Sequence, residues 1–191
     1  MRLRHMLSTV AGVVIVASSS LAFAADNYKV DSAHSTVVFK VGHVGASNYY
    51  GRFNDPTGTV VQDAADPSKS SFNVEVQVEK VDTANEKRDA HLKSPDFFDA
   101  KQFPTITFKS TAVKGSGDKL DVIGDLTLHG VTKSITVPIT KVGEKDAGKM
   151  GYRAGWEATF DIKRSDYGMT NMVGPVGDDV KLIVSIEAVK S

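Results

Sequence analysis

The chain has 191 residues and no cysteine, and its 23 lysine and arginine side chains balance 23 aspartate and glutamate side chains. Hydrophobic residues make up 41% of the chain and charged residues 24%, which excludes a disordered, collagen-like or multi-span membrane protein. The zero net charge gives no general attraction to nucleic acid, so no nucleic acid partner is expected. This length suits one domain, and without disulfides its core and backbone hydrogen bonds must stabilise it.

Residues 1–24 have the features of an export signal. The stretch begins with two arginines, continues with an apolar run too short to span a bilayer, and ends in the small-residue pattern Ala22-Phe23-Ala24. The sequence therefore predicts a signal peptide cleaved after Ala24 and a single mature domain at residues 25–191. We expect this domain to act outside the cytoplasm, in a bacterial periplasm.

The rest of the chain is dominated by apolar and polar residues that alternate with a period of two, which predicts strands with one buried face. Turn sequences such as Gly115–Asp118 and His129-Gly130 separate these runs, Asp55-Pro56 interrupts one, and residues 143–148 are expected to form a flexible charged connection. Seven or eight antiparallel strands with short connections indicate a barrel or a sandwich. In chain order, the alternation covers residues 37–41, 72–78, 106–108, 120–128, 135–139, 152–162 and 180–188.

One segment breaks the alternation. The capping-box sequence that begins at Thr83 predicts a short helix through Leu92, and Ser94-Pro95 predicts a second helical start. Three phenylalanines follow before the next strand. Such a crossing segment is expected to cover one end of a barrel.

No motif for catalysis or metal binding emerges from the mature sequence. Its four histidines lack the short spacing to a carboxylate that metal motifs have, and no nucleophile elbow or phosphate-binding glycine loop occurs. No catalytic residue, metal or cofactor is therefore predicted, although a metal cluster assembled only in three dimensions stays an alternative. The histidines are His34, His43, His91 and His129.

The interior of the barrel is open to two interpretations. Eight strands enclose a space that side chains either just fill or leave free for one small ligand. The inward candidates mix small residues such as Val74 and Ala158 with large ones such as Trp156. This mixture is compatible with a hollow and with a solid core, since an apolar ligand needs only shape and apolar walls.

Several blocks, in order along the mature chain, resemble a known family. The most distinctive runs from Arg88 to Ser110, and others lie at 30–53, 124–133 and 164–182. Together they resemble the YceI-like family of exported polyisoprenoid-binding proteins. The resemblance implies an all-β, eight-stranded antiparallel lipocalin-like barrel with a short helical crossing segment at one end and a long apolar tunnel. It also implies a bound isoprenoid chain, such as a quinone tail or a polyprenyl phosphate; a fatty acid or fatty amide is the alternative ligand.

The strand pattern and the resemblance together suggest which residues form the site. Five polar residues are expected either to brace the crossing segment and a late loop or to contact a headgroup, namely Arg88, His91, Ser94, Arg164 and Asp166. Aromatic and methionine side chains are expected to line or lid the tunnel, with a solid core as their alternative role. These are Phe39, Phe53, Phe72, Phe97, Phe98, Phe103, Phe108, Trp156, Phe160, Met169 and Met172.

The sequence thus predicts a binding or carrier protein for a long-chain isoprenoid lipid, not an enzyme. Transient contact with a membrane and a homodimer are its further expected partners. Two rivals stay open. One is an enzyme that acts on such a lipid through His91 or Arg88, and the other is a filled barrel with an interaction role.

Overall fold

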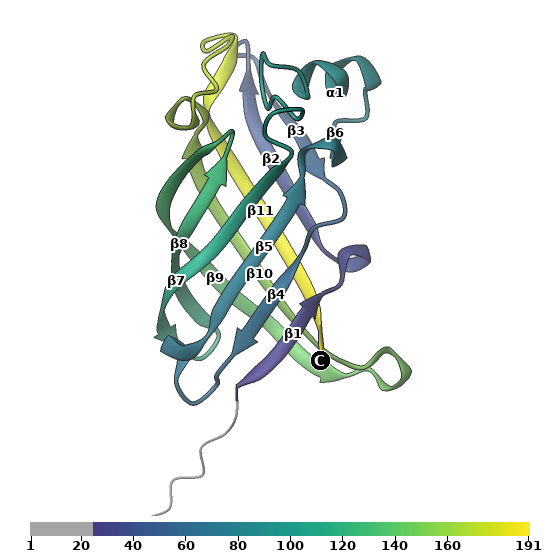
Figure 1. Ribbon diagram of the computed structural model, residues 1–191, viewed down its shortest axis with the longest axis vertical. Helices are drawn as coiled ribbons and strands as arrows, with labels where there is room; N and C mark the ends of the chain where they lie inside the picture. Colours follow the sequence, from purple (N-terminus) through teal and green to yellow (C-terminus); the bar gives the residue numbers. More distant parts are fainter. Residues whose placement is uncertain (1–24) are drawn as a thin grey trace, which may run out of the picture.

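Antiparallel strands surround a central axis in the computed structural model, which describes residues 25–191 (Figure 1). The predicted signal peptide lies outside the described residues. Within residues 25–191, no helix has both the length and the apolar character needed to cross a membrane. The elements are β1 (Asp26–Val30), β2 (Thr36–His43), β3 (Ser47–Phe53), β4 (Thr57–Gln62), β5 (Ser71–Gln77), β6 (Val81–Asp82), α1 (Glu86–Leu92), β7 (Thr105–Ser116), β8 (Lys119–Leu128), β9 (Val131–Asp146), β10 (Tyr152–Lys163) and β11 (Val176–Lys190).

The first three barrel strands are each broken into two segments. A 3-10 turn at Ser32–His34 separates β1 from β2, the Asp55-Pro56 bend separates β3 from β4, and a 3-10 turn at Val78–Lys80 separates β5 from β6. The two segments of each broken strand pair in the same order as those of the others. β4 lies between β1 and β5, and β3 lies between β2 and β6. Both β1 and β2 pair with β11, so the eleven segments form the predicted eight-stranded antiparallel barrel.

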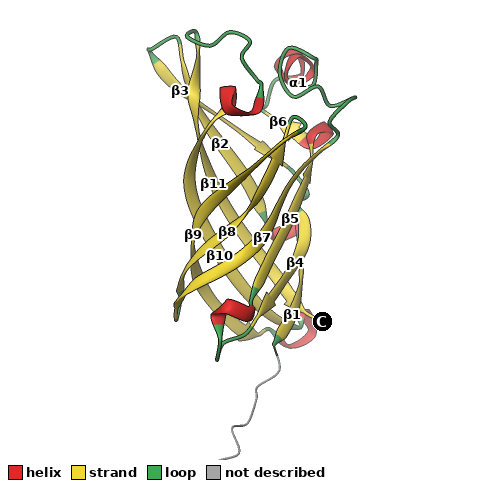
Figure 2. Cartoon of the chain, turned by 60° about the vertical axis from the view of Figure 1, so that its left-hand side comes forward, coloured by secondary structure: helices red, strands yellow, loops and turns green. Residues whose placement is uncertain are grey.

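The two ends of the barrel carry different structures (Figures 1 and 2). Helix α1, the β2–β3 turn and the β10–β11 connection lie at one end, here called the upper end. The C-terminus and the β9–β10 connection lie at the opposite, lower end. The crossing segment therefore covers part of one end, as the sequence predicted.

Two of the expected connections differ in outcome. His129 and Gly130 both have positive φ, 51° and 73°, so they form the predicted tight hairpin between β8 and β9. The flexible connection expected at residues 143–148 is wrong, because β9 continues to Asp146 and pairs with β10. Residues 143–146 of β9 are exposed at the edge of this pairing, so charged residues and glycine are tolerated within the strand there.

The crossing segment also differs in detail from its prediction. Helix α1 is capped by Asn85, whose Oδ1 accepts a hydrogen bond from Arg88 N at 3.0 Å, whereas Thr83 bonds to Asp89. The second helix expected at Ser94 is a series of turns, in which the Ser94 carbonyl accepts from two backbone N–H groups. Phe97, which lies within these turns, is buried.

Candidate functional site

The barrel is hollow along much of its axis. Two adjoining cavities, the lower and the upper chamber, measure about 800 and 780 Å³ with their open mouths included. We call the two chambers together the tunnel, and they meet at a common waist formed by five residues that line both, Val37, Val76, Ile106, Leu126 and Leu182.

Alternation along each strand decides which side chains reach the tunnel. On β10, Trp156, Ala158 and Phe160 line the lower chamber, and Ile162 continues the row into the upper chamber. Apart from Glu157 in the lower chamber and Arg164 in the upper one, every lining residue is apolar. A tunnel of this kind binds its occupant by shape and by removing apolar surface from water.

Two wall phenylalanines lie flat because they face glycines. A Cβ atom on Gly51 would lie 2.2 Å from Cζ of Phe39, and one on Gly124 would lie 2.5 Å from Cζ of Phe108. The absence of a side chain at each glycine lets the neighbouring ring lie against the barrel wall. The glycines thus keep aromatic bulk out of the lumen.

The lower end of the barrel is packed. Trp156 makes edge-to-face contacts with Tyr28 and Phe72, at ring-centroid distances of 5.5 and 5.9 Å. Val122 and Ala188 are fully buried in the same cluster. Burial raises the pKa of Tyr28 above its ordinary value, and Asp26 and Glu144 add to the shift. The tunnel therefore ends on this aromatic plug.

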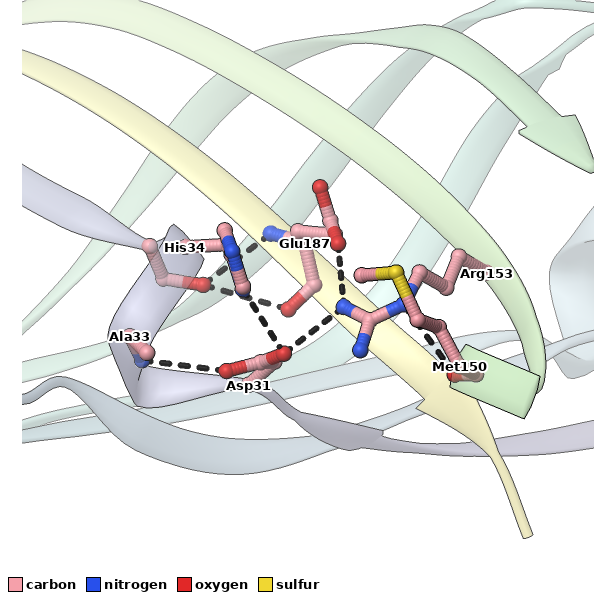
Figure 3. A network of polar contacts seen from close by, with 7 residues as sticks. Asp31, Ala33, His34, Met150, Arg153 and Glu187 are labelled. Carbon is pink, nitrogen blue, oxygen red and sulfur yellow. Dashed lines mark hydrogen bonds and ion pairs between the residues drawn. The ribbon is translucent and has the colours of Figure 1, made fainter. Parts of the chain in front are cut away.

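A network of ion pairs links the strands near the same end of the barrel (Figure 3). Nη1 of Arg153 on β10 donates to Asp31 Oδ2 at 2.7 Å and to Glu187 on β11, and His34 Nδ1 lies 2.9 Å from Asp31 Oδ2. The hydrogen bond from Arg153, followed by that from His34, lowers the pKa of Asp31 to about 2. The network ties the turn between β1 and β2 to β10 and β11, where the barrel closes.

Three of these groups resemble a set of cation ligands. The ligand atoms of Asp31, His34 and Glu187 lie within 4.8 Å of one another. Arg153 donates to both carboxylates and supplies the positive charge that a cation would bring. The sequence could not reveal this cluster, since Arg153 lies 122 residues from Asp31.

The structure places most of the predicted tunnel residues on the wall. Whether they touch a ligand stays a prediction, but they line one of the two chambers. The residues concerned are Phe39, Phe53, Phe72, Phe97, Phe98, Phe108, Trp156, Phe160 and Met169. The aliphatic residues of the waist are not among the predicted site residues, although they belong to the same alternating pattern.

Phe103 and Met172, which were also expected on the wall or lid, line neither chamber. The ring of Phe103 packs against His129, with centroids 4.8 Å apart, and covers Gly130 of the β8–β9 hairpin. Met172 has a φ of 54° and a 46% exposed side chain. Each lies on a connection between secondary-structure elements.

The polar residues of the crossing segment make bracing contacts. Arg88 donates to both oxygens of Thr83, at 2.8 and 2.7 Å, and its guanidinium lies 4.0 Å from the ring centroid of Tyr49. His91 Nε2 lies 2.9 Å from Asp96 Oδ2, and Ser94 Oγ donates to the His91 carbonyl at 2.7 Å. These contacts hold α1 over the upper end.

Arg164 is a buried guanidinium that lines the upper chamber. Burial lowers its pKa. Asp166 is separate from it and lies 3.5 Å from Lys133 Nζ on the surface. Arg164 itself donates hydrogen bonds to four backbone carbonyls at 2.7 to 3.1 Å, those of Met169, Asn171, Val176 and Gly177. These bonds brace the connection that leads into β11.

Comparison with known structures finds the same barrel elsewhere. BcnA of Burkholderia cenocepacia superposes with a TM-score of 0.75 at 26% identity, covering 84% of this chain and 99% of that one. A polyisoprenoid binding domain from Saccharophagus degradans, implicated in plant cell wall breakdown, gives a TM-score of 0.68 at 15% identity, covering 86% and 98%. At that identity the second likeness shows the fold alone.

Sequence comparison is more specific. A UPF0312 protein of Pseudomonas aeruginosa is 38% identical over 190 residues, covering 98% of this chain and 99% of the relative. Protein YceI of Salmonella paratyphi B is 40% identical over 184 residues, or 95% of each chain. The model of the YceI-like domain matches residues 28–188. The chain therefore belongs to the YceI-like family.

Proposed function

We propose that this protein binds a long-chain isoprenoid lipid in the tunnel and carries it through the periplasm after export. The observation that carries the proposal is the tunnel itself, two adjoining chambers with almost wholly apolar walls and a plug at one end. The polyisoprenoid-binding domain with the same barrel supports it. The basic, then apolar, start of the sequence supports export.

The energetics favour a long chain. Each buried methylene contributes about 0.8 kcal/mol, so about 20 carbons gain on the order of 16 kcal/mol before ordering costs. Nanomolar binding needs about 12 kcal/mol. Apolar walls are therefore sufficient for tight binding, and the buried guanidinium of Arg164 marks the chamber wall that would lie nearest a polar end group.

We propose that the polar residues of the upper end brace the fold and do not catalyse a reaction. Arg88 and His91 are engaged in the bracing contacts described above. An enzyme would lose turnover on Arg88→Ala or His91→Ala while it kept its lipid affinity. We expect instead that the native protein shows no turnover of a lipid and that both variants are less stable than it.

Two measurements test the binding function. Organic extraction of native protein followed by mass spectrometry should yield an isoprenoid lipid, and lipid-free protein that also fails to bind a prenyl alcohol would contradict the proposal. Ala158→Phe places a ring in the lower chamber, so we expect at least a tenfold loss of prenyl affinity with little change in Tm. In a solid core the same change would destabilise by about 1–3 kcal/mol. Ala112→Phe, on the exposed outer face of β7, is the matched control.

A further inference from the structure

The upper end exposes apolar side chains on two neighbouring connections. Val44, in the β2–β3 turn, is 58% exposed, and Met172 and Val173, before β11, are 46% and 47% exposed. The Val44 N–H donates to the carbonyl of Pro175 at 2.7 Å, so the two connections lie side by side. Figure 1 shows both at the end that carries α1. We call Val44, Met172 and Val173 the upper rim.

The upper rim lies within two stretches of the chain that carry no charged side chain. Residues 41–51 and residues 167–177 contain no lysine, arginine, aspartate or glutamate. With 24% charged residues, two stretches of this combined length would ordinarily hold about five charges. A charged side chain is costly to move into hydrocarbon, and these two stretches would bring none with them.

The same connection reaches both the tunnel and the outer surface. Met169 and Val176 line the upper chamber, while Met172 and Val173 between them face outward. Arg164 holds this connection through its backbone carbonyls. One connection therefore contributes apolar side chains both to the chamber wall and to the outside of the rim.

We propose that the upper rim docks on the surface of a lipid bilayer, with the tips of both connections in the interfacial region. The proposal rests on the proposed function, because a membrane holds the isoprenoid lipid that the tunnel would take up. The absence of charge commits the surface to apolar contact, so anionic lipid is not required. Tyr50, 53% exposed on β3 below the tip, suits the interface between headgroups and acyl chains. The charged crossing segment beside the rim stays in water.

Sedimentation with phosphatidylcholine vesicles tests the docking. We expect native protein to bind them, and the double variant Met172→Asp with Val173→Asp to bind at least tenfold more weakly. The matched control is Val142→Asp with Met150→Asp, an exposed valine and methionine at the lower end, which should leave binding unchanged. Equal binding by the two double variants, or no binding by native protein, would overturn the proposal.

Backbone strain supplies a second, independent readout. Val44 and Met172 have φ values of 46° and 54°, a left-handed conformation that Asn adopts more readily than Val or Met. Val44→Asn and Met172→Asn should therefore keep or raise Tm while they weaken vesicle binding. A fall in binding that always accompanies a fall in Tm would instead indicate unfolding and count against docking.

Two further measurements separate the docking from its rivals. Vesicle binding should be the same at low and high salt; binding only to anionic vesicles, lost at high salt, would assign the contact to the crossing segment and overturn the proposal. A dimer that the Asp variants split, with no vesicle binding, would assign the rim to a second copy. Prenyl alcohol binding in solution should survive in the rim variants, and its absence from native protein would refute the proposed function while rim-dependent vesicle binding still stood.

Discussion

The two ends of this barrel differ in packing, since the lower end is filled by side chains and the upper end encloses a chamber. At the lower end, Tyr28, Phe72 and Trp156 interlock, and Arg153 clamps the closing strands through two carboxylates. At the upper end, apolar side chains line a chamber, and residues 41–51 and 167–177 beside it include no lysine, arginine, aspartate or glutamate. One end contributes stability and the other leaves space, which shows how a small barrel stays folded around a hollow.

The sharpest test of this division compares two aromatic residues on one strand. Trp156→Ala should destabilise by about 3–5 kcal/mol, because it removes the centre of the plug. Phe160 lies four residues further along β10 and faces the tunnel. Phe160→Ala should therefore lower the free energy of unfolding by less than half as much. Urea unfolding of both variants measures the difference, and equal losses would break the distinction between plug and tunnel.

The Arg153 network should contribute a smaller, pH-dependent part of the stability. Asp31 has its pKa lowered from 3.8 to about 2, so its contribution is present above pH 3.8 and is lost as pH falls towards 2. Arg153→Gln removes the first cause of that shift. We expect a Tm a few degrees lower at neutral pH and a gap to native protein that narrows between pH 3.8 and 2. A gap independent of pH would refute this account of the clamp.

The smallest effect is expected where a ring lies flat on the tunnel wall. In Gly51→Ala the new methyl group meets the far end of the Phe39 side chain, so the ring must tilt into the upper chamber. We predict about a tenfold weaker affinity for a prenyl alcohol, near 1.4 kcal/mol, with the fold intact. Gly143→Ala is the control, since its Cβ would meet nothing within 4 Å. Unchanged affinity in Gly51→Ala would mean that the ligand does not pass Phe39.

The sequence anticipated what depends on near neighbours. Alternation placed Trp156 and Phe160 on the inner face of β10, and the His129-Gly130 hairpin followed from its turn chemistry. Phe103 and Met172 lie on connections outside the alternating strands and line neither chamber. The break in β5 at Val78–Lys80 had no signal in the sequence, whereas that at Asp55-Pro56 did.

By itself, the sequence determined the antiparallel strands and the apolar character of their inner face, because alternation and turn chemistry act over a few residues, and its motifs carried the family resemblance. Only the tertiary structure decided that the inner face encloses a tunnel and that one end is plugged. Those outcomes depend on side chains such as Asp31 and Arg153, or Tyr28 and Trp156, which lie more than a hundred residues apart. Whether such residues meet in a packed cluster or leave a space is set by the closure of the whole barrel.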